Sequence, residues 1–428
     1  MLLKTITVQN FCGFESLEAN FSSGVNVIAG INGAGKTSLL KAISIAASQI
    51  WHQASRFSCP ELRLASDFIR KSNEKYENGF RFEEQLPCYV KGIFINNSQE
   101  YEANACINLE VEKKIPKSRV SPSVKTWEEN LPLLACYWAA RSWNQPKDVS
   151  AVAAATAKEP RVSGYASALD ASADVKSFVA WIVTRTFERL QSIAVEHKTA
   201  EDLDHDELGI LNRALEKALP NEFAGISFDV KQRSIFVEFK RDGRINKTAF
   251  ENLSEGEKSF ICLIADIARR ICVLNPQLGA RVLEETQGLV LIDELDLHLH
   301  PAWQRRIIRS LQETFPKVQF IVTTHSPQIL GEVAPDQVLL LSRGHISRPL
   351  QSFGLSSDEI LRDLMGTADM STDISQLVDR AYAYLDAEKF QDARKTIAEI
   401  QKLTRGDTEE TVSLETFVNT LDDISSEE

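Results

Sequence analysis

A chain of 428 residues is long enough to form one large domain or two modest ones, each with its own core. With 43% hydrophobic and 25% charged residues, its composition is ordinary for a soluble globular protein. No apolar run is long enough to cross a bilayer, and the chain begins with a strand-like pattern rather than a signal peptide. The net charge of −12 argues against a protein that coats nucleic acid unaided, although it leaves room for a local basic patch.

Seven cysteines are scattered along the chain without a CxxC pair or a regular spacing. Most lie in apolar stretches, which is typical of buried, reduced thiols rather than of a zinc site, and we expect a cytoplasmic protein. The pair His298 and His300 has no third ligand in view and is a weak signal for a metal site. The acidic end, residues 422–428, is expected to be solvated and frayed.

The first 29 residues predict strands, the last of which is the apolar run Val25–Ala29. The next stretch, Gly30–Thr37, matches G-x-x-x-x-G-K-[ST] and leads into a helix-like pattern that extends to about Gln49. In such a loop backbone N–H groups converge on phosphate oxygens, and the helix N-terminus adds its dipole. Lys36 is expected to reach the β- and γ-phosphates of ATP, and Thr37 to hold Mg²⁺. The residues predicted to bind the nucleotide here are Gly30, Asn32, Gly33, Gly35, Lys36, Thr37 and Ser38.

The pattern changes over residues 51–130, where a polar, charged stretch precedes strand-like pieces at Cys88–Ile95 and Ala103–Val111. The next segment, Lys113–Arg119, is basic and is expected to be a loop. A solvated surface turn and a contact to the DNA backbone both remain open for this segment.

The apolar run Leu131–Arg141 predicts a buried strand, and the Ala-, Ser- and Gly-rich stretch after it predicts a mobile loop to about Asp170. Two helices are expected next, at Lys176–His197 and Asp206–Leu219. Neither sustains heptads, so we expect no long coiled-coil arm. The residues expected on one apolar face of the first helix are Phe178, Trp181, Ile182, Phe187 and Leu190.

From Ile226 onward the pattern alternates between strands and helices. After about Ser356 the chain is expected to be helical, with a helix pair at Ile374–Glu388 and Phe390–Leu403. The elements expected before that point are strands Ile226–Val230, Ser234–Lys240, Gly288–Ile292, Val318–Val322 and Gln337–Leu341, and helices Phe260–Leu274 and Trp303–Thr314.

Two acidic residues, Asp293 and Glu294, directly follow the strand predicted at Gly288–Ile292. With a phosphate loop upstream, the aspartate is expected to hold Mg²⁺ and the glutamate to act as the catalytic base toward water. His325 follows the next strand, and parallel strands end at one edge of a sheet, so we expect it beside the acids and against the γ-phosphate. Lys36, Glu294 and His325 are therefore the predicted catalytic residues.

The turn Leu253–Glu257, which we name the signature turn, starts the next apolar helix and is a second candidate anion-binding device. One chain cannot easily wrap one nucleotide with both devices, whereas two chains facing head to tail can. Ser254, Gly256 and Glu257 of one copy are then expected to meet the nucleotide held by the phosphate loop of the other. Taken alone, the turn is equally well explained as a capped helix start.

In this order the phosphate loop, the signature turn, the acidic strand end and His325 resemble the ABC-type ATPases of the recombination and chromosome-maintenance branch, which includes RecF, SMC and OLD proteins. The phrases Asp293–Pro301 and Thr323–Pro327 are similar to those of small stand-alone ATPases of bacterial defence and retron-associated systems. Glu255 and Glu257 depart from the Gly and Gln of transporter ATPases. The family's glutamine that follows the lid insertion has no clear match here.

Within that branch, the lack of heptads separates the chain from SMC proteins, and a short helical end without clustered acids separates it from OLD nucleases. In its length and in the residues of its motifs, the chain is most similar to the PtuA family, the ATPases of Septu antiphage systems. The partner of PtuA in that family is PtuB, an HNH nuclease. The resemblance is specific over residues 1–50 and 250–345, and it implies slow ATP hydrolysis that controls a nuclease in another chain. A RecF-like repair ATPase is the alternative, while a transporter ATPase and a structural ATP site are weaker hypotheses.

These observations predict an α/β fold, an ABC-type P-loop ATPase head with an antiparallel β lobe, a helical insertion and a C-terminal helical region. The ATPase domain is expected at residues 1–144 and 221–350, the insertion at 145–220, and a partner-docking region at 351–428. ATP should close two copies head to tail as a switch, and larger oligomers should be built from such dimers. DNA is expected to be reached through the complex, and no membrane is expected.

Overall fold

The computed structural model describes residues 1–56, 58–76, 79–96, 99–110, 113–124, 127, 129–140, 160–173, 175–197, 199–220, 222–241, 243–342, 344–366, 372–387, 389–406 and 408–427. Residues 141–159 therefore lie outside the described part, and with them Arg141, most of the predicted loop and the first part of the predicted insertion. Two compact units make up the chain, Met1–Ser356 and Ser357–Glu428. No helix among the described residues combines the length and the apolar character that a bilayer crossing requires.

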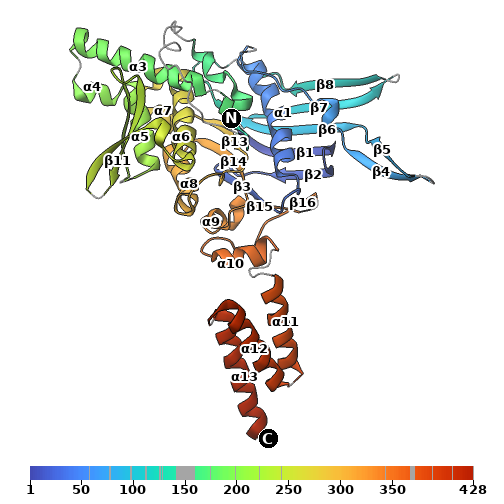
Figure 1. The fold of residues 1–428 in the computed structure, drawn as a ribbon. Helices are drawn as coiled ribbons and strands as arrows, with labels where there is room; N and C mark the ends of the chain where they lie inside the picture. The colour runs from blue at the N-terminus through green and yellow to red at the C-terminus, as the bar shows by residue number, and fades with distance from the viewer. Residues whose placement is uncertain are drawn as a thin grey trace. The chain divides into compact units, whose positions relative to one another are not determined.

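The first unit is built on a sheet with the strand order β16-β15-β3-β14-β13-β9 (Figure 1). Its neighbours pair in parallel, except that β16 returns antiparallel beside β15. The predicted strands are confirmed, and parallel pairing brings the carboxyl ends of β3, β14 and β13 to one edge, where ligands bind in α/β sheets. The strands are β3 (Val25–Ala29), β9 (Leu133–Tyr137), β13 (Gly288–Ile292), β14 (Val318–Thr324), β15 (Val338–Ser342) and β16 (His345–Ser347).

Helices pack on both faces of this sheet, with α1 (Lys36–Ala54) on one side and α6 (Glu255–Leu274) on the other (Figure 1). α1 extends five residues beyond the predicted end and is buried on most sides, because a second, antiparallel sheet covers its other face. The remaining helices of this region are α7 (Val282–Glu285), α8 (Pro301–Thr314) and α9 (Pro327–Leu330), with 3₁₀ turns η1 (Ser66–Phe68), η2 (Arg161–Tyr165), η3 (Ala168–Ala173), η4 (Phe250–Asn252), η5 (Pro276–Arg281) and η6 (Pro335–Gln337).

The predicted antiparallel lobe is a sheet in the order β2-β1-β6-β7-β8, and the polar stretch before it forms the hairpin β4–β5. Lys113–Arg119 is not a loop as predicted, because these residues belong to β8 and pair along β7. β8 is an edge strand, where lysines and a proline are tolerated and guard against further pairing. The strands are β1 (Leu2–Phe11), β2 (Phe14–Asn20), β4 (Lys71–Tyr76), β5 (Gly79–Glu84), β6 (Cys88–Asn96), β7 (Gln99–Glu110) and β8 (Lys113–Ser121).

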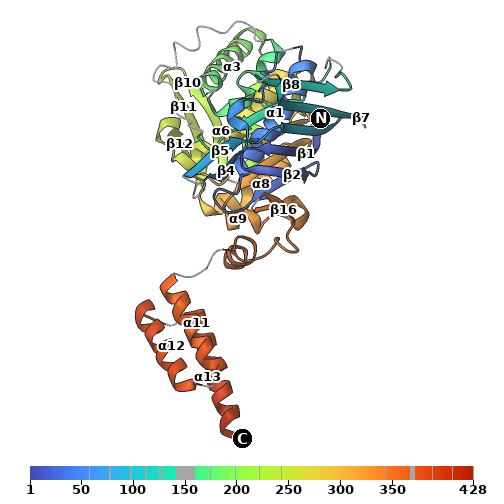
Figure 2. The same ribbon diagram turned by 90° about the vertical axis from the view of Figure 1, so that its right-hand side faces the viewer.

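Helix α3 lies beside an antiparallel sheet in the order β10-β11-β12 (Figure 2). α5 also packs on β10, and α4 packs on α5. The prediction of a single apolar face on α3 is wrong in its second half, since Phe187 and Leu190 are 48% and 47% exposed. Only the first half of α3 packs into the core, and ion pairs to α5 hold the second half. The elements are α3 (Val175–Glu196), α4 (Ala200–Asp204), α5 (Glu207–Ala218), β10 (Phe223–Asp229), β11 (Ser234–Arg241) and β12 (Arg244–Ala249).

A buried charge network fixes α6 against the parallel sheet. Asp266 on α6 accepts hydrogen bonds from Arg269 and Arg270 on the same helix and from the Tyr137 hydroxyl of β9, at 2.8 Å. Burial alone would raise the pKa of Asp266, but Arg270 and Arg269 hold it below its ordinary value. Arg270 also donates to the carbonyl of Gly164 in η2, so the network joins three elements through one charged carboxylate.

The second unit is a helical bundle with its own apolar core, drawn from its three longest helices. The prediction of a frayed acidic end is wrong, because residues 422–427 belong to the last helix. This unit carries 18 acidic and 7 basic side chains, and so accounts for −11 of the chain's net charge of −12. Its elements are α10 (Ser357–Glu359), the π-helical turn η7 (Ile360–Leu364), α11 (Thr372–Asp386), α12 (Phe390–Thr404) and α13 (Glu409–Glu427).

A candidate ATP-binding and hydrolysis site

The phosphate loop connects β3 to α1 at the carboxyl edge of the parallel sheet. Gly35 is the N-cap of α1 in a left-handed conformation, with φ of +103°. A Cβ at this position would lie 2.6 Å from the Phe14 ring, so the close approach of β2 also requires glycine there. Lys36 Nζ donates to the carbonyls of Gly30 and Ile31, at 2.8 and 3.2 Å. The loop is therefore shaped by its own contacts before any ligand is considered.

Thr37 and Asp293 meet where α1 and β13 come together. The Thr37 hydroxyl donates to Oδ2 of Asp293 at 2.9 Å, and the carboxylate is only 2% exposed. Both are hard oxygen donors of the kind that Mg²⁺ takes from proteins, alongside the oxygens of substrate phosphates. The two predicted metal ligands thus lie side by side and fit such an ion, which would neutralise phosphate charge when bound.

Glu294 and His325 lie at the same edge, after the parallel neighbours β13 and β14. The pKa of His325 is lowered by burial and by the nearby Lys36 ammonium, against the opposing pull of Asp296, Glu294 and Asp293. Burial also lowers the pKa of Lys36, although the same three carboxylates oppose the shift. The predicted catalytic residues therefore share one electrostatic environment, in which carboxylates outnumber ammonium groups.

Asp296 is a site residue that sequence reasoning missed. Its Oδ1 accepts a hydrogen bond from the Thr324 hydroxyl at 2.6 Å and another from the backbone N–H of His325 at 3.3 Å. The carboxylate therefore ties the loop after β13 to the turn after β14. A third acid two residues beyond the acidic pair was the available signal, but nothing in its spacing indicates which backbone it would hold.

The signature turn starts α6 with a capping box. The Ser254 hydroxyl accepts from the Glu257 N–H at 3.3 Å, and the Glu257 carboxylate accepts from the Ser254 N–H at 2.9 Å. A Cβ on Gly256 would lie 2.5 Å from the carbonyl oxygen of His298, so this glycine allows α6 to touch the loop between β13 and α8. Ser254, Gly256 and Glu257 thus begin a helix on the opposite side of the sheet from α1 (Figure 1).

The loop between β13 and α8 holds two non-glycine residues in the left-handed region, Glu294 with φ of +48° and His298 with φ of +65°. Such conformations cost free energy and persist where surrounding contacts impose them. His300 is the N-cap of α8, and its Nδ1 accepts from the Ala302 N–H at 3.3 Å. Among the described residues no group of three or more His, Cys, Asp or Glu side chains is placed to hold a metal ion.

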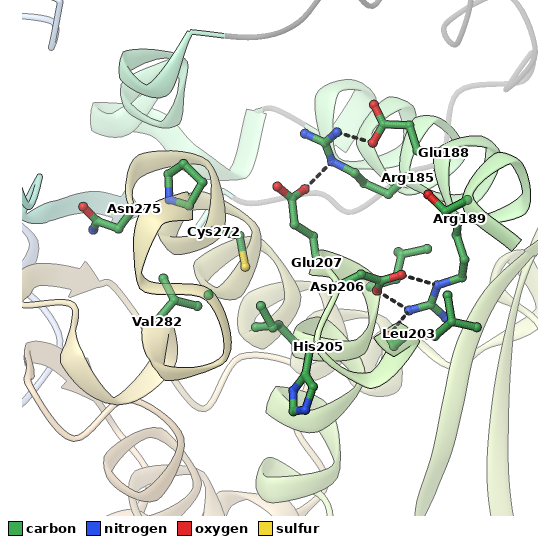
Figure 3. Close-up of a pocket in the computed structure, with 15 residues that line it drawn as sticks. Arg185, Glu188, Arg189, Leu203, His205, Asp206, Glu207, Cys272, Asn275 and Val282 are labelled. Carbon is green, nitrogen blue, oxygen red and sulfur yellow. Dashed lines mark hydrogen bonds and ion pairs between the residues drawn. The ribbon is translucent and has the colours of Figure 1, made fainter. Parts of the chain in front are cut away.

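A cavity of about 260 Å³ lies apart from these residues, between α3, α5 and the C-terminal end of α6 (Figure 3). Its charged side chains pair with one another, since Arg189 binds Asp206, and Arg185 binds Glu188 and Glu207. Burial raises the pKa of Glu207, and Arg185 opposes this shift. Because these walls neutralise each other, the cavity offers no surplus of positive charge for a phosphate, and we assign the nucleotide to the phosphate loop.

Two family models match the chain. The family described as AAA ATPase domain matches residues 1–131, and a family of AAA domains described with the AbiEii toxin of type IV toxin–antitoxin systems matches residues 138–331. Together these matches cover the phosphate loop, the signature turn, the acidic strand end and His325. The chain is an ATPase of the P-loop class.

Two relatives are similar to this chain over most of their own length. Retron Vc95 probable ATPase of Vibrio cholerae serotype O1 biovar El Tor is 28% identical, over 94% of this chain and 87% of its own. Septu protein PtuA of Bacillus thuringiensis is 26% identical, over 86% and 84%. Among solved structures, an SMC head bound to the C-winged helix domain of ScpA has a TM-score of 0.46 and 14% identity, over 82% of this chain and 98% of its own. The predicted resemblance to retron-associated and Septu ATPases is confirmed by the first two.

Proposed function

We propose that this chain is the ATP-driven switch subunit of a bacterial antiphage defence complex. In this proposal ATP closes two copies head to tail, and the closed state licenses a partner HNH nuclease that cleaves DNA. Glu294 activates the attacking water, His325 contacts the γ-phosphate, and Thr37 and Asp293 hold Mg²⁺. Hydrolysis then reopens the pair and resets the switch.

The observation that carries the proposal is the position of the signature turn. The helix that it starts, α6, and the helix α1 after the phosphate loop begin on opposite sides of one sheet, so the two N-termini do not face the same phosphate group within one chain (Figure 1). Each is built to receive an anion or a cap. A second copy, turned head to tail, would bring Ser254 and Gly256 to the nucleotide on Lys36 and so complete the site. The similarity to Septu and retron ATPases supports the defence context, and the nuclease partner is what the resemblance to the PtuA family implies.

The distribution of charge bears on the alternative, a RecF-like repair ATPase that acts on DNA by itself. Residues 1–356 carry 42 acidic and 41 basic side chains, so the first unit is close to neutral. Of the overall charge of −12, the second unit therefore carries −11, and the net charge gives no argument against DNA contacts made by the ATPase unit. One outcome of the following experiment would therefore favour the repair ATPase.

Affinity purification of the chain, expressed with its native neighbouring genes, tests the proposal. Mass spectrometry identifies what co-elutes, and the eluate is assayed for DNA cleavage with and without ATP. We expect a co-eluting HNH protein and nuclease activity that depends on the nucleotide. A chain that elutes alone and binds DNA only with ATP would favour the repair ATPase instead.

Glu294→Gln tests whether turnover, rather than bound ATP alone, sets the output. The amide keeps the shape of the side chain but cannot accept a proton, so ATP hydrolysis should fall by roughly 10²-fold or more. ATP-dependent dimers should persist longer than in the wild type, as sedimentation or light scattering would show. Unchanged hydrolysis and unchanged dimer lifetime would instead support an ATP site with a purely structural role.

A further inference from the structure

Thr323, near the end of β14, makes hydrogen bonds to both acidic residues of the candidate site. Its hydroxyl donates to Oδ1 of Asp293 at 2.7 Å and accepts from the backbone N–H of Glu294 at 2.8 Å. Its carbonyl accepts from the N–H of Leu295 at 2.9 Å, so three consecutive residues after β13 are held by this one position. The Thr323 side chain is fully buried and cannot itself reach solvent.

The two oxygens of Asp293 thereby receive different partners. Thr323 occupies Oδ1, and the Thr37 hydroxyl lies against Oδ2. A hydroxyl has one proton to donate, and the Glu294 N–H fixes its lone pair, so the proton of Thr323 is aimed at Oδ1. The carboxylate is then locked in rotation, with Oδ2 left on the side of the phosphate loop. A metal ligand that is oriented in this way needs no reorganisation when the ion arrives.

The same hydroxyl also acts on the backbone of Glu294. That residue has a φ of +48°, a left-handed conformation that is unfavourable for a side chain other than glycine. The Glu294 N–H donates to the Thr323 hydroxyl and the Leu295 N–H to the Thr323 carbonyl, and these two bonds can hold the turn in place. The direction in which Glu294 leaves the strand is therefore tied to a side chain on the neighbouring strand.

From these contacts we infer that Thr323 is a positioning residue for ATP hydrolysis, which orients the metal-facing oxygen of Asp293 and the backbone of Glu294 through one hydroxyl. The inference rests on the roles proposed above for these two acids. Because Thr323 is fully buried and its hydroxyl bonds to the two acids, its effect should appear in how the acids work rather than in nucleotide affinity as such.

The test compares Thr323→Val, Thr323→Ala and Thr323→Ser in the full-length chain. Valine and alanine remove the hydroxyl, while serine retains it. With valine or alanine, kcat should fall by about 10- to 100-fold, the effect typical of removing a partner that orients a metal ligand, while the KM for MgATP changes little. The Mg²⁺ concentration for half-maximal turnover should rise in both, and serine should restore both quantities.

Thr314 offers a matched control, because it is also fully buried but its hydroxyl has no hydrogen-bond partner in the part of the chain that the structure describes. Thr314→Val should leave turnover and the Mg²⁺ dependence unchanged. Electron paramagnetic resonance of Mn²⁺ gives a readout besides activity, since the Mn²⁺ affinity of the ATP-bound protein should drop in Thr323→Val and not in Thr314→Val.

Three outcomes decide between the inference and its premise. If Glu294→Gln abolishes hydrolysis while Thr323→Val and Thr323→Ala match the wild type, the role of Thr323 is refuted and the roles of the acids stand. If Glu294→Gln hydrolyses ATP normally, the premise itself is wrong. If Thr323→Val does not fold, Thr323→Ala and Thr323→Ser still decide, because an alanine variant with wild-type Mg²⁺ dependence, or a serine variant without it, contradicts the inference.

Discussion

His325 shows how one residue in the site responds to charges from several elements. Its pKa is lowered by burial first and by Lys36 of α1, while Asp296, Glu294 and Asp293 of the loop after β13 pull it upward. The lowered pKa favours the neutral imidazole, in which one ring nitrogen accepts and the other donates a hydrogen bond. A neutral histidine suits a contact to a γ-phosphate that must also be released.

This depressed pKa predicts how stability depends on pH. As pH falls through the ordinary histidine value, about 6.5, the unfolded chain takes up a proton that folded His325 does not bind, so the folded state loses free energy relative to the unfolded one. The stabilising contribution is present above that pH and is lost below it. Between pH 7.5 and 5.5 the free energy of unfolding of the wild type should fall more than that of His325→Gln, as urea titrations would measure. Parallel curves for the two proteins would contradict the shift.

At the scale of elements, the capping box of α6 separates two roles of Ser254 that the sequence left open. Serine and aspartate cap a helix about equally well, whereas alanine at an N-cap costs about 1 kcal/mol. A carboxylate at this position would, however, repel a phosphate approaching from a second copy. The two roles can therefore be told apart by the choice of substitution.

We predict that Ser254→Asp keeps the thermal stability of the wild type but loses ATP-dependent dimerisation, measured by sedimentation with and without ATP. Ser254→Ala should lower the melting temperature and retain part of the dimerisation. The head-to-tail arrangement is wrong if Ser254→Asp dimerises on ATP as the wild type does. Asp336→Glu, a conservative change at an exposed acidic position outside the site, is the control and should match the wild type in both stability and ATP-dependent dimerisation.

The elements that sequence reasoning found were those whose pattern is local. The apolar runs at β3, β13 and β14 are long enough and buried enough to be recognised, and their parallel order follows from the helices between them. β8 was missed because its lysines and proline suit a loop, and only its pairing with β7 makes it a strand. The second half of α3 was expected to continue the apolar face of the first half, because periodicity does not say where packing stops.

The site divides in the same way. The sequence alone reveals the phosphate loop Gly30–Thr37 and the acidic pair Asp293 and Glu294, because phosphate binding requires those residue types in that order. Thr323 and Asp296 act through hydrogen bonds between the ends of the neighbouring strands β13 and β14. Neither segment by itself indicates that these two strands pair. A threonine at the end of an apolar strand is too common to be selected as a site residue without the fold.

At the scale of the whole molecule, the second unit is a separate compact body with its own core and almost all of the net charge. A chain that ends at Ser356 should therefore keep its ATP hydrolysis, because the site lies wholly within the first unit. It should lose the partner nuclease if the region 351–428 docks it, as co-purification would show. Retention of the partner by the shortened chain would rule that docking region out.

The concentration of acidic residues in one unit has a consequence for colloidal behaviour that is independent of any partner. With 42 acidic and 41 basic side chains, residues 1–356 have almost no net charge at neutral pH, where repulsion between copies is weakest. The acidic bundle supplies that repulsion to the ATPase unit to which it is joined. The shortened chain should thus be least soluble near pH 7 and should dissolve again as the buffer is made alkaline, so precipitation in a docking experiment reports lost charge rather than a lost fold.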